Sequence, residues 1–173
     1  MTAYSSIVDT PIGPFTAVVG DDGAVLAAGW TASLDGLLPV VAPGLRPVEV
    51  IPRPDLGSVT SAVRDYHAGD LGAIDEIPVR QTSGPFIAHA WDVLRTVPPG
   101  KSTTYTDFAA LAGRPDAIRA AASACARNAV ALFVPCHRIV RTDGSLGGFR
   151  WGLPVKRWLL DHETGPPLRN SMR

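Results

Sequence analysis

The segment Val134-Pro135-Cys136-His137-Arg138 places a thiol, an imidazole and a guanidinium on three consecutive residues. Only a small fraction of an ordinary thiol is ionised at neutral pH, and a neighbouring imidazole or cation is expected to raise that fraction. The chain has two cysteines, of which Cys125 is the other. Cys136 is therefore the candidate nucleophile, and the chemistry it favours is covalent attack by sulfur.

A buried packing role is the alternative for Cys136, because the apolar run 129–134 comes shortly before it. Pro135 ends that run and a polar pair follows the cysteine, which favours the chemical role. Adjacent residues of a strand point to opposite faces, so Cys136 and His137 can cooperate only across a turn or through a water molecule. The spacing therefore does not predict a compact dyad of the thiol-protease kind.

The composition is that of a globular chain. It has 173 residues, 46% of them hydrophobic, and no apolar run approaches membrane-spanning length. The N-terminus lacks a basic segment followed by an apolar one. Two cysteines and four scattered histidines match no disulfide framework and no zinc-ligand spacing. We therefore expect a cytoplasmic monomer, with no membrane partner, no metal and no other cofactor.

The net charge of zero hides an asymmetry between two halves of the chain. Residues 82–85 (Thr-Ser-Gly-Pro) have the composition of a linker, which predicts two domains, 1–83 and 84–173. The first has 4 basic and 10 acidic residues and the second has 12 and 6, giving formal charges of −6 and +6. A polyanionic partner or attraction between the halves would each explain this count.

Residues 1–83 are predicted to form a small, mainly antiparallel β lobe with one helix. Segments 4–8, 15–19 and 25–28 have strand composition and are separated by turn-forming residues. The Pro-rich passage 38–54 predicts no regular structure, and the apolar spacing over 56–67 predicts a helix. This lobe carries no chemical motif of its own, so it is interpreted as a scaffold.

Residues 84–173 are predicted to form a mostly helical lobe, which makes the fold class mixed α/β (α+β). An apolar stripe predicts a helix over 85–95. Shorter helices are expected over 104–113 and from Pro115 to about Arg127, and together they would make a helix-turn-helix. Cys125 lies in the second of these helices and is interpreted as a packing residue, while His162 is assigned to the surface.

From Phe86 to Glu163 the chain resembles the O6-alkylguanine-DNA alkyltransferase family. The resemblance rests on Pro135-Cys136-His137-Arg138, on Asn128, on the glycine-rich segment 144–149 and on the spacing of Lys156-x-x-Leu-Leu-x-x-Glu163. The opening segment 9–14 (Asp-Thr-Pro-Ile-Gly-Pro) is similar to the N-terminal lobe of that family.

The resemblance implies DNA repair by irreversible transfer of a methyl or small alkyl group from O6 of guanine, or O4 of thymine, to Cys136. The protein would act once per molecule. Its partner would be double-stranded DNA containing O6-alkylguanine, bound through the minor groove by the helix-turn-helix with the damaged base flipped out of the stack.

The resemblance also implies a role for each site residue. Cys136 would accept the alkyl group, His137 would deprotonate it through a water molecule, and Glu163 would orient the imidazole. Asn128 would hold the turn that carries the cysteine, and Tyr105 would donate a hydrogen bond to the guanine. The expected DNA-binding residues are Arg119, which would fill the gap left by the base, and Ala120, Ser123, Thr104 and Arg127. The expected pocket residues are Val134, Pro135, Phe149, Trp151, Gly147 and Gly148.

The sequence departs from the commonest family pattern near the site. Ala129 replaces a frequent proline, Phe149 a frequent tyrosine, and Ala122 and Ser123 a frequent glycine pair. Trp151 stands where some members have glycine, and its indole is predicted to narrow the pocket and disfavour bulky alkyl groups.

Two other classes of function stay open. One is a protein that recognises alkylated DNA, or responds to alkylation as a regulator, without efficient repair. Cys136 argues against the first form, because non-repairing relatives lack that cysteine, and a regulator would usually carry a further domain. The other is a redox or hydrolytic thiol enzyme, which would need a resolving cysteine or a histidine in direct contact with the thiol.

Overall fold

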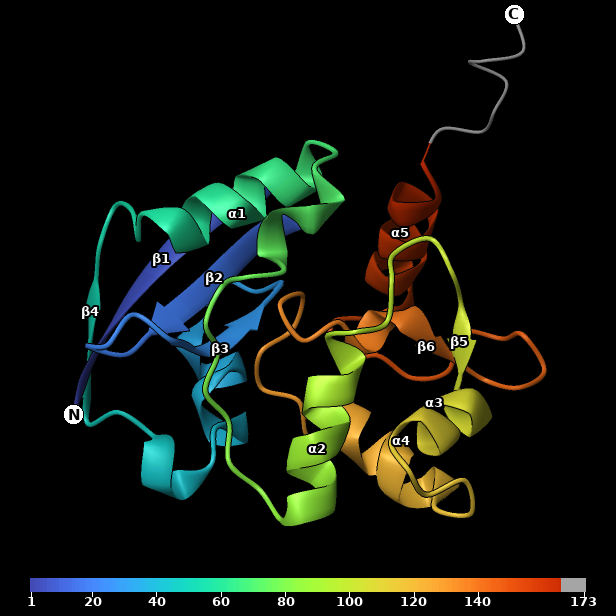
Figure 1. Ribbon diagram of the computed structural model, residues 1–173. Coiled ribbons are helices and arrows are strands. Elements are labelled where there is room, and N and C mark those ends of the chain that lie inside the picture. Colours follow the sequence, from blue (N-terminus) through green and yellow to red (C-terminus); the bar gives the residue numbers. More distant parts are fainter. Residues whose placement is uncertain (166–173) are drawn as a thin grey trace, which may run out of the picture.

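The first half of the chain contains a four-stranded sheet (Figure 1). In the computed structural model, which describes residues 1–165, β1 (Thr2–Thr10), β2 (Gly13–Val19) and β3 (Val25–Gly29) make the antiparallel meander predicted from the sequence. Strand β4 (Glu49–Pro52) adds in parallel to β1, which gives the order β3-β2-β1-β4. The expectation of no regular structure over 38–54 was wrong at β4, where a proline is tolerated because the strand lies at the sheet edge.

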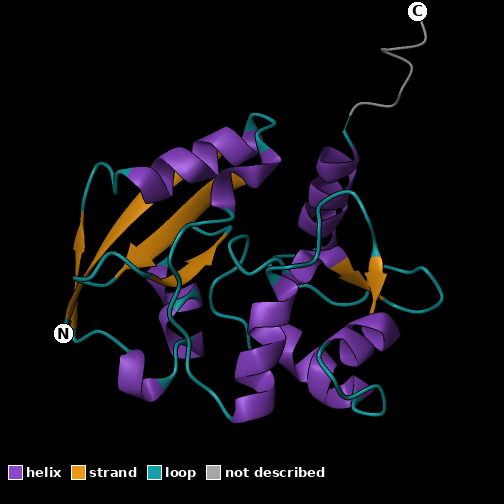
Figure 2. Cartoon of the chain, in the orientation of Figure 1, coloured by secondary structure: helices purple, strands orange, loops and turns teal. Residues whose placement is uncertain are grey.

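Helix α1 (Ser58–His67) lies across one face of this sheet, as Figures 1 and 2 show. Its Val59, Ala62, Val63 and Tyr66 side chains are buried, so the helix closes the core of this half. Three short 3-10 turns, at 34–36, 38–40 and 43–45, carry the chain between β3 and β4.

The second half is mainly helical, as predicted. It contains α2 (Pro85–Leu94), α3 (Tyr105–Leu111), α4 (Ile118–Ala126) and α5 (Leu153–Thr164). A short parallel pair, β5 (Thr103–Thr104) with β6 (Ile139–Val140), was not predicted, because two residues are too few to give a sequence pattern. Helix α4 begins at Ile118 and not at Pro115, since Ala117 (φ −101°, ψ 48°) still has non-helical backbone.

The two halves share one continuous apolar core. The segment after α4 pairs with the outer edge of β3 through two hydrogen bonds. Ala28 N donates to Ala129 O (2.9 Å), and Ala131 N donates to Ala28 O (3.1 Å). Behind this junction the rings of Phe15 and Phe133 pack edge to face, 6.4 Å apart. The segment that leads to Cys136 is therefore fixed to the sheet of the other half.

An aromatic contact also joins the halves through α1 and α5. The Trp158 ring stacks on His67 from one half and on His162 from the other, with centroid distances of 5.8 and 4.4 Å. His162 Nε2 lies 2.7 Å from the Tyr66 carbonyl oxygen. The assignment of His162 to the surface was therefore wrong, because its ring is half-buried between α1 and α5.

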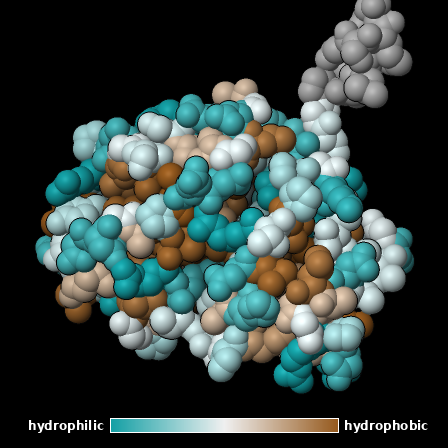
Figure 3. Space-filling view, viewed as in Figure 1, coloured by the Kyte–Doolittle hydropathy of each residue, from teal (hydrophilic) through white to brown (hydrophobic). Residues whose placement is uncertain are grey.

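Within residues 1–165, the opposite net charges of the two halves form no ion pair across the junction, since every ion pair joins two groups of the same half. On the face in Figure 3, apolar side chains appear as small areas among polar ones. Within the same residues, no helix combines the length and apolar character that a membrane span requires.

Candidate active site

The turn 128–136 carries Cys136 and is organised by the buried amide of Asn128. Asn128 Nδ2 donates to Val134 O (2.8 Å) and to Cys136 Sγ (3.3 Å), while its Oδ1 accepts from Val130 N (3.0 Å). Gln81, from the other half, donates to Asn128 Oδ1 and accepts from Ala129 N, both at 2.9 Å. These contacts fix which end of the amide faces the sulfur, and they make Asn128 a donor to it.

The same turn contains backbone strain. Leu132 has φ 74°, the only left-handed backbone at a non-glycine residue in the described part of the chain. Such a conformation costs on the order of 1 kcal/mol, and the fully buried Leu132 side chain holds it in place. Strain of this kind persists where packing specifies the local geometry, and here that geometry positions the cysteine.

Cys136 begins a short 3-10 turn (Cys136–Arg138) and is only 9% exposed. Burial raises the pKa of its thiol, and the Asn128 hydrogen bond and the positive charge of Lys156 only partly offset this. The expectation that the neighbouring groups would increase ionisation was therefore wrong for the resting protein, because desolvation dominates. The thiol is neutral at rest and needs a base at the moment of attack.

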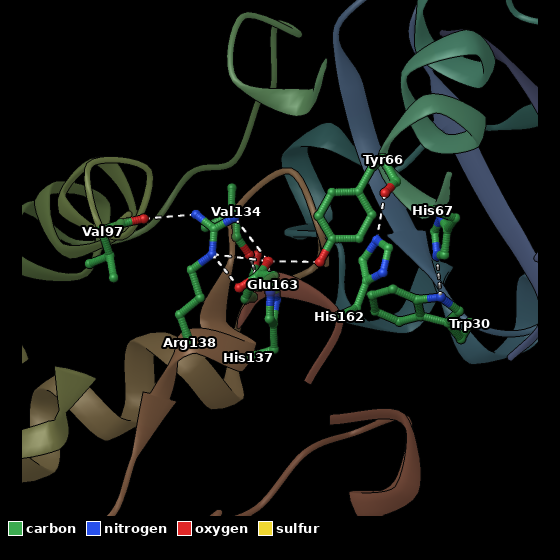
Figure 4. Close-up of polar contacts among 10 residues, drawn as sticks. Trp30, Tyr66, His67, Val97, Val134, His137, Arg138, His162 and Glu163 are labelled. Atoms are coloured by element: carbon green, nitrogen blue, oxygen red, sulfur yellow. Dashed lines mark hydrogen bonds and ion pairs between the residues drawn. The ribbon is translucent and has the colours of Figure 1, made fainter. Parts of the chain in front are cut away.

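Glu163 joins the base, His137, to two other side chains in the interior, Tyr66 and Arg138 (Figure 4). His137 Nε2 and Tyr66 Oη each lie 2.7 Å from Glu163 Oε2. Arg138 donates to the same carboxylate through Nε (3.0 Å to Oε1) and Nη2 (3.0 Å to Oε2), and its Nη1 donates to Val97 O (2.7 Å). Tyr66 comes from α1, so the first half of the chain contributes directly to this cluster and is more than a scaffold.

The protonation state of this cluster follows from its charges. Burial favours the neutral acid, but the hydrogen bonds from His137 and Arg138 outweigh it and lower the pKa of Glu163 to about 2. Burial lowers the pKa of His137, so its ring is neutral at pH 7. An ionised carboxylate at 2.7 Å selects the tautomer with the proton on Nε2. The lone pair therefore lies on Nδ1, which has no hydrogen-bond partner within residues 1–165 and is free to accept a proton.

Cys136 lines a cavity of about 320 Å³, named here the Cys136 cavity. Its other lining residues are Tyr105, Ala122, Cys125, Ala126, Asn128, Ala131, Gly148, Phe149, Arg150 and Trp151. Of the expected pocket residues, Phe149, Trp151 and Gly148 line it. Val134, Pro135 and Gly147 do not line it: the first two are buried, and Gly147 lines a neighbouring groove instead. Cys125 is only half-buried, so it forms part of the wall rather than only filling the core.

Tyr105 lines this cavity and lies close to Gly147. Burial raises the pKa of Tyr105 to about 12, so its phenol is a hydrogen-bond donor at neutral pH. A Cβ atom at Gly147 would lie 3.3 Å from the Tyr105 hydroxyl, and the backbone there has φ 74°. Glycine at position 147 thus permits both the turn and the close approach to the phenol.

Lys156 was not predicted as a site residue, but it is hydrogen-bonded to Gly148, which lines the Cys136 cavity. Its buried ammonium donates to Ile139 O (2.7 Å), to Leu146 O and to Gly148 O (3.4 Å). Burial lowers its pKa. The similarity of 156–163 to a family motif marked this residue, but only the fold shows that it orders the glycine-rich segment 144–149.

The expected DNA-binding residues lie along α4 and at the start of α3. Arg119, Ser123 and Arg127 are exposed, and Ala120 is half-buried. Thr104 is the N-cap of α3, and its hydroxyl accepts from Asp107 N at 3.0 Å. Arg119 also lines a second groove that shares Tyr105, Ala122 and Gly148 with the Cys136 cavity. The structure therefore brings Arg119 and the thiol cavity to adjacent positions.

Comparisons with known proteins agree with this geometry. Residues 85–165 match the family described as "6-O-methylguanine DNA methyltransferase, DNA binding domain". The methylated-DNA–protein-cysteine methyltransferase of Shigella flexneri is 32% identical over 90% of this chain and 92% of its own length, and that of Mus musculus is 33% identical over 96% and 85%.

A solved structure supports the same relationship at the level of the fold. The crystal structure of Mycobacterium tuberculosis OGT in complex with DNA superposes with a TM-score of 0.77 and 26% identity, covering 93% of this chain and 92% of that one. The buried Cys136–Asn128 turn, the His137–Glu163 pair and these similarities lead to one conclusion: the chain belongs to the methylated-DNA–protein-cysteine methyltransferase family.

Proposed function

We propose that this protein repairs DNA by transferring a methyl or small alkyl group from O6 of guanine to Cys136 Sγ. The observation that carries the proposal is the position of the thiol, which lines a cavity of about 320 Å³. The adjacent residue, His137, forms a buried pair with Glu163. A soft nucleophile in a shaped cavity suits displacement at an sp3 carbon, since that reaction needs in-line approach more than it needs acid catalysis.

The reaction begins when His137 Nδ1 takes the proton of the Cys136 thiol through a water molecule. The sulfur then forms a bond to the alkyl carbon, the carbon–O6 bond breaks, and its electron pair stays on the base. The neutral phenol of Tyr105 donates a hydrogen bond to the guanine and stabilises this developing negative charge. The product on the protein is a thioether, which has no good leaving group, so each molecule acts once.

DNA binding is assigned to α3 and α4 as a helix-turn-helix that lies in the minor groove. The target carbon is inside the base stack, and extrusion of the nucleotide costs a few kcal/mol. Arg119 is exposed next to the Cys136 cavity, where it is placed to occupy the gap left by the base and offset part of that cost.

The chain supplies all these groups itself, so we propose a monomer in the cytoplasm, where a free thiol stays reduced. In this proposal residues 84–173 bind DNA and accept the alkyl group. Residues 1–83 hold the active-site turn and the carboxylate through Gln81 and Tyr66.

The decisive experiment is the intact mass of the protein after incubation with duplex DNA containing O6-methylguanine, followed by peptide mapping. One methyl group on Cys136, and no more than one per molecule, is the expected result. Tight binding to the lesion without any gain in mass would favour a protein that only recognises alkylated DNA.

Trp151 is predicted to restrict the alkyl groups that the cavity accepts. Its indole packs directly on Gly29 of β3, where a Cβ atom would overlap the ring. This contact leaves the indole little room to move away from a bulky group. Trp151→Gly should therefore raise the rate of benzyl transfer by roughly tenfold or more and change methyl transfer little. Rates with O6-benzylguanine and O6-methylguanine measure this, and equal benzyl and methyl rates in the wild type would refute it.

Arg119 is predicted to act on duplex DNA only. Arg119→Ala should slow methyl transfer from duplex DNA by roughly tenfold or more, because nothing then offsets the cost of base extrusion. Transfer from the free base O6-methylguanine needs no extrusion and should stay unchanged. Single-turnover rates on both substrates, with Arg157→Ala on the exposed side of α5 as the control, test this. Equal slowing on both substrates would assign Arg119 to cavity structure instead.

A further inference from the structure

Another cavity, of about 410 Å³, is lined by residues of both halves and is distinct from the groove that Arg119 lines. It is named here the arginine groove. Residues 39–43, 45, 46 and 80–82 line it from the first half, and Ala126, Arg127, Ala129 and Arg150 line it from the second. Its remaining lining residues are Leu26 and Trp91. The groove therefore combines a partly apolar surface with side chains from both halves of the chain.

The charge of this groove is strongly one-sided. Arg46, Arg80, Arg127 and Arg150 line it, and no aspartate or glutamate does. Arg80 pairs with Asp22, whereas the other three take part in no ion pair among residues 1–165. The acidic first half has only four basic residues, and two of them are in this groove.

Two of the guanidinium groups are already held in place. Arg46 Nη2 donates to Pro39 O (3.2 Å) and Val41 O (2.9 Å), and Arg150 Nη2 donates to Ala126 O (2.6 Å). Each group keeps further N–H donors, since a guanidinium has five. Because these arginine side chains are partly ordered before binding, they would lose less conformational entropy when an anion binds.

The groove adjoins the Cys136 cavity. Ala126 and Arg150 line both, and Arg127 follows directly at the end of α4. A nucleotide whose base occupied the Cys136 cavity would have its backbone at this boundary. A sugar–phosphate strand matches the groove chemically, because deoxyribose contacts apolar surface and the phosphate takes guanidinium donors.

We propose that the arginine groove binds a backbone phosphate of the damaged strand next to the flipped nucleotide, and that Arg46 brings the first half of the chain into contact with DNA. The inference rests on the proposed function, since it needs a nucleotide in the Cys136 cavity. An acidic peptide is the competing ligand. The position of the groove beside the Cys136 cavity favours the DNA strand.

The first test is the salt dependence of binding to a duplex containing O6-methylguanine, measured in a Cys136→Ser background so that no transfer occurs. Each phosphate contact contributes about 0.9 to the slope of log K against log salt concentration. Arg46→Gln should lower that slope by about 1, whereas Arg46→Lys, which keeps the charge, should preserve it. Arg157→Gln, an exposed arginine outside the groove, is the matched control and should leave the slope unchanged.

The second test locates the phosphate. Methylphosphonate linkages, which are neutral, are placed one at a time on either side of the lesion. One position should weaken binding to the protein with Arg46 by roughly five- to tenfold and have almost no effect on Arg46→Gln. Absence of any such position would overturn the proposal, as would an Arg46→Lys slope as low as that of Arg46→Gln.

Methyl transfer from free O6-methylguanine separates this inference from the proposed function. The Arg46 variants with Cys136 intact should transfer at the wild-type rate, because the free base has no phosphate. Failure of the wild type to transfer methyl from either substrate would refute the proposed function. Normal transfer with no phosphate-specific effect of Arg46 would refute only the arginine groove.

Discussion

Replacing Cys136 by serine (Cys136→Ser) is expected to abolish methyl transfer while DNA binding changes by less than about threefold. A hydroxyl is far less acidic than a thiol and its oxygen is a poorer nucleophile toward carbon. Burial lowers the pKa of His137, which makes it a weaker base, and a hydroxyl proton is harder to remove than a thiol proton. Serine can still accept the Asn128 Nδ2 hydrogen bond that Sγ receives, so the turn should fold normally. Intact mass after incubation with methylated duplex, together with a binding isotherm, measures both effects.

Cys125→Ser is the matched control, because Cys125 lines the same cavity. Burial raises the pKa of Cys125, as it does that of Cys136, but Cys125 is followed by Ala126 and not by a histidine that could act as its base. This variant should still gain one methyl group. Methylation that persisted in Cys136→Ser and disappeared in Cys125→Ser would move the acceptor role to Cys125.

Glu163→Gln is expected to lower the free energy of unfolding by roughly 3–5 kcal/mol, because Arg138 would keep a buried charge without its partner. It should also slow methyl transfer by roughly a hundredfold, because the neutral amide no longer fixes the tautomer of His137. Urea unfolding and single-turnover rates measure the two effects. Asp161→Asn, an exposed carboxylate on the same helix, should change neither. A Glu163→Gln protein as stable as the wild type would show that the carboxylate does not compensate the guanidinium.

The same carboxylate predicts how stability depends on pH. The pKa of Glu163 is about 2 in the folded protein against an ordinary value of 4.5. A lowered pKa of this kind stabilises the fold above about pH 4.5, and the contribution is lost as the pH falls toward 2. His137 acts in the same direction from its ordinary value of 6.5 downward, because the fold favours its neutral form.

The unfolding free energy should therefore fall below about pH 6.5, and more steeply below about pH 4.5. The difference between the wild type and Glu163→Gln should shrink over the lower interval, since glutamine does not titrate. A constant difference from about pH 5 to about pH 3 would contradict the assigned pKa.

Much of the architecture could be predicted because its signals are local. Short segments of strand composition, separated by turn-forming residues, predicted β1 to β3. Gly113 and Pro115 indicated the connection between α3 and α4. Strand β4 was missed because it pairs with β1 at long range and its proline masks the pattern. The motif around Cys136 indicated the nucleophile, since its residue types are adjacent in sequence.

The supporting residues could not be predicted in the same way. Tyr66 and Gln81 reach the site from the other half, across separations of 97 and 47 residues to Glu163 and Asn128. Nothing in their local sequence distinguishes them from ordinary helix or loop residues. The pKa of Cys136 was predicted in the wrong direction because the sequence shows neighbouring cations and does not show burial.

The junction of β3 with residues 129–131 has a consequence for how the protein assembles. The contact between Ala28 and Val130 closes a loop of about a hundred residues. Closing this loop costs conformational entropy before the contact contributes any stabilisation. The meander is made first by the ribosome. Residues 78–80 pair with the Val25 end of the β3 edge, but the Ala28 end stays unpaired until residues 129–131 arrive. We therefore expect the turn bearing the nucleophile to form late, so that partly folded chains expose an edge prone to aggregation and have no reactive thiol site.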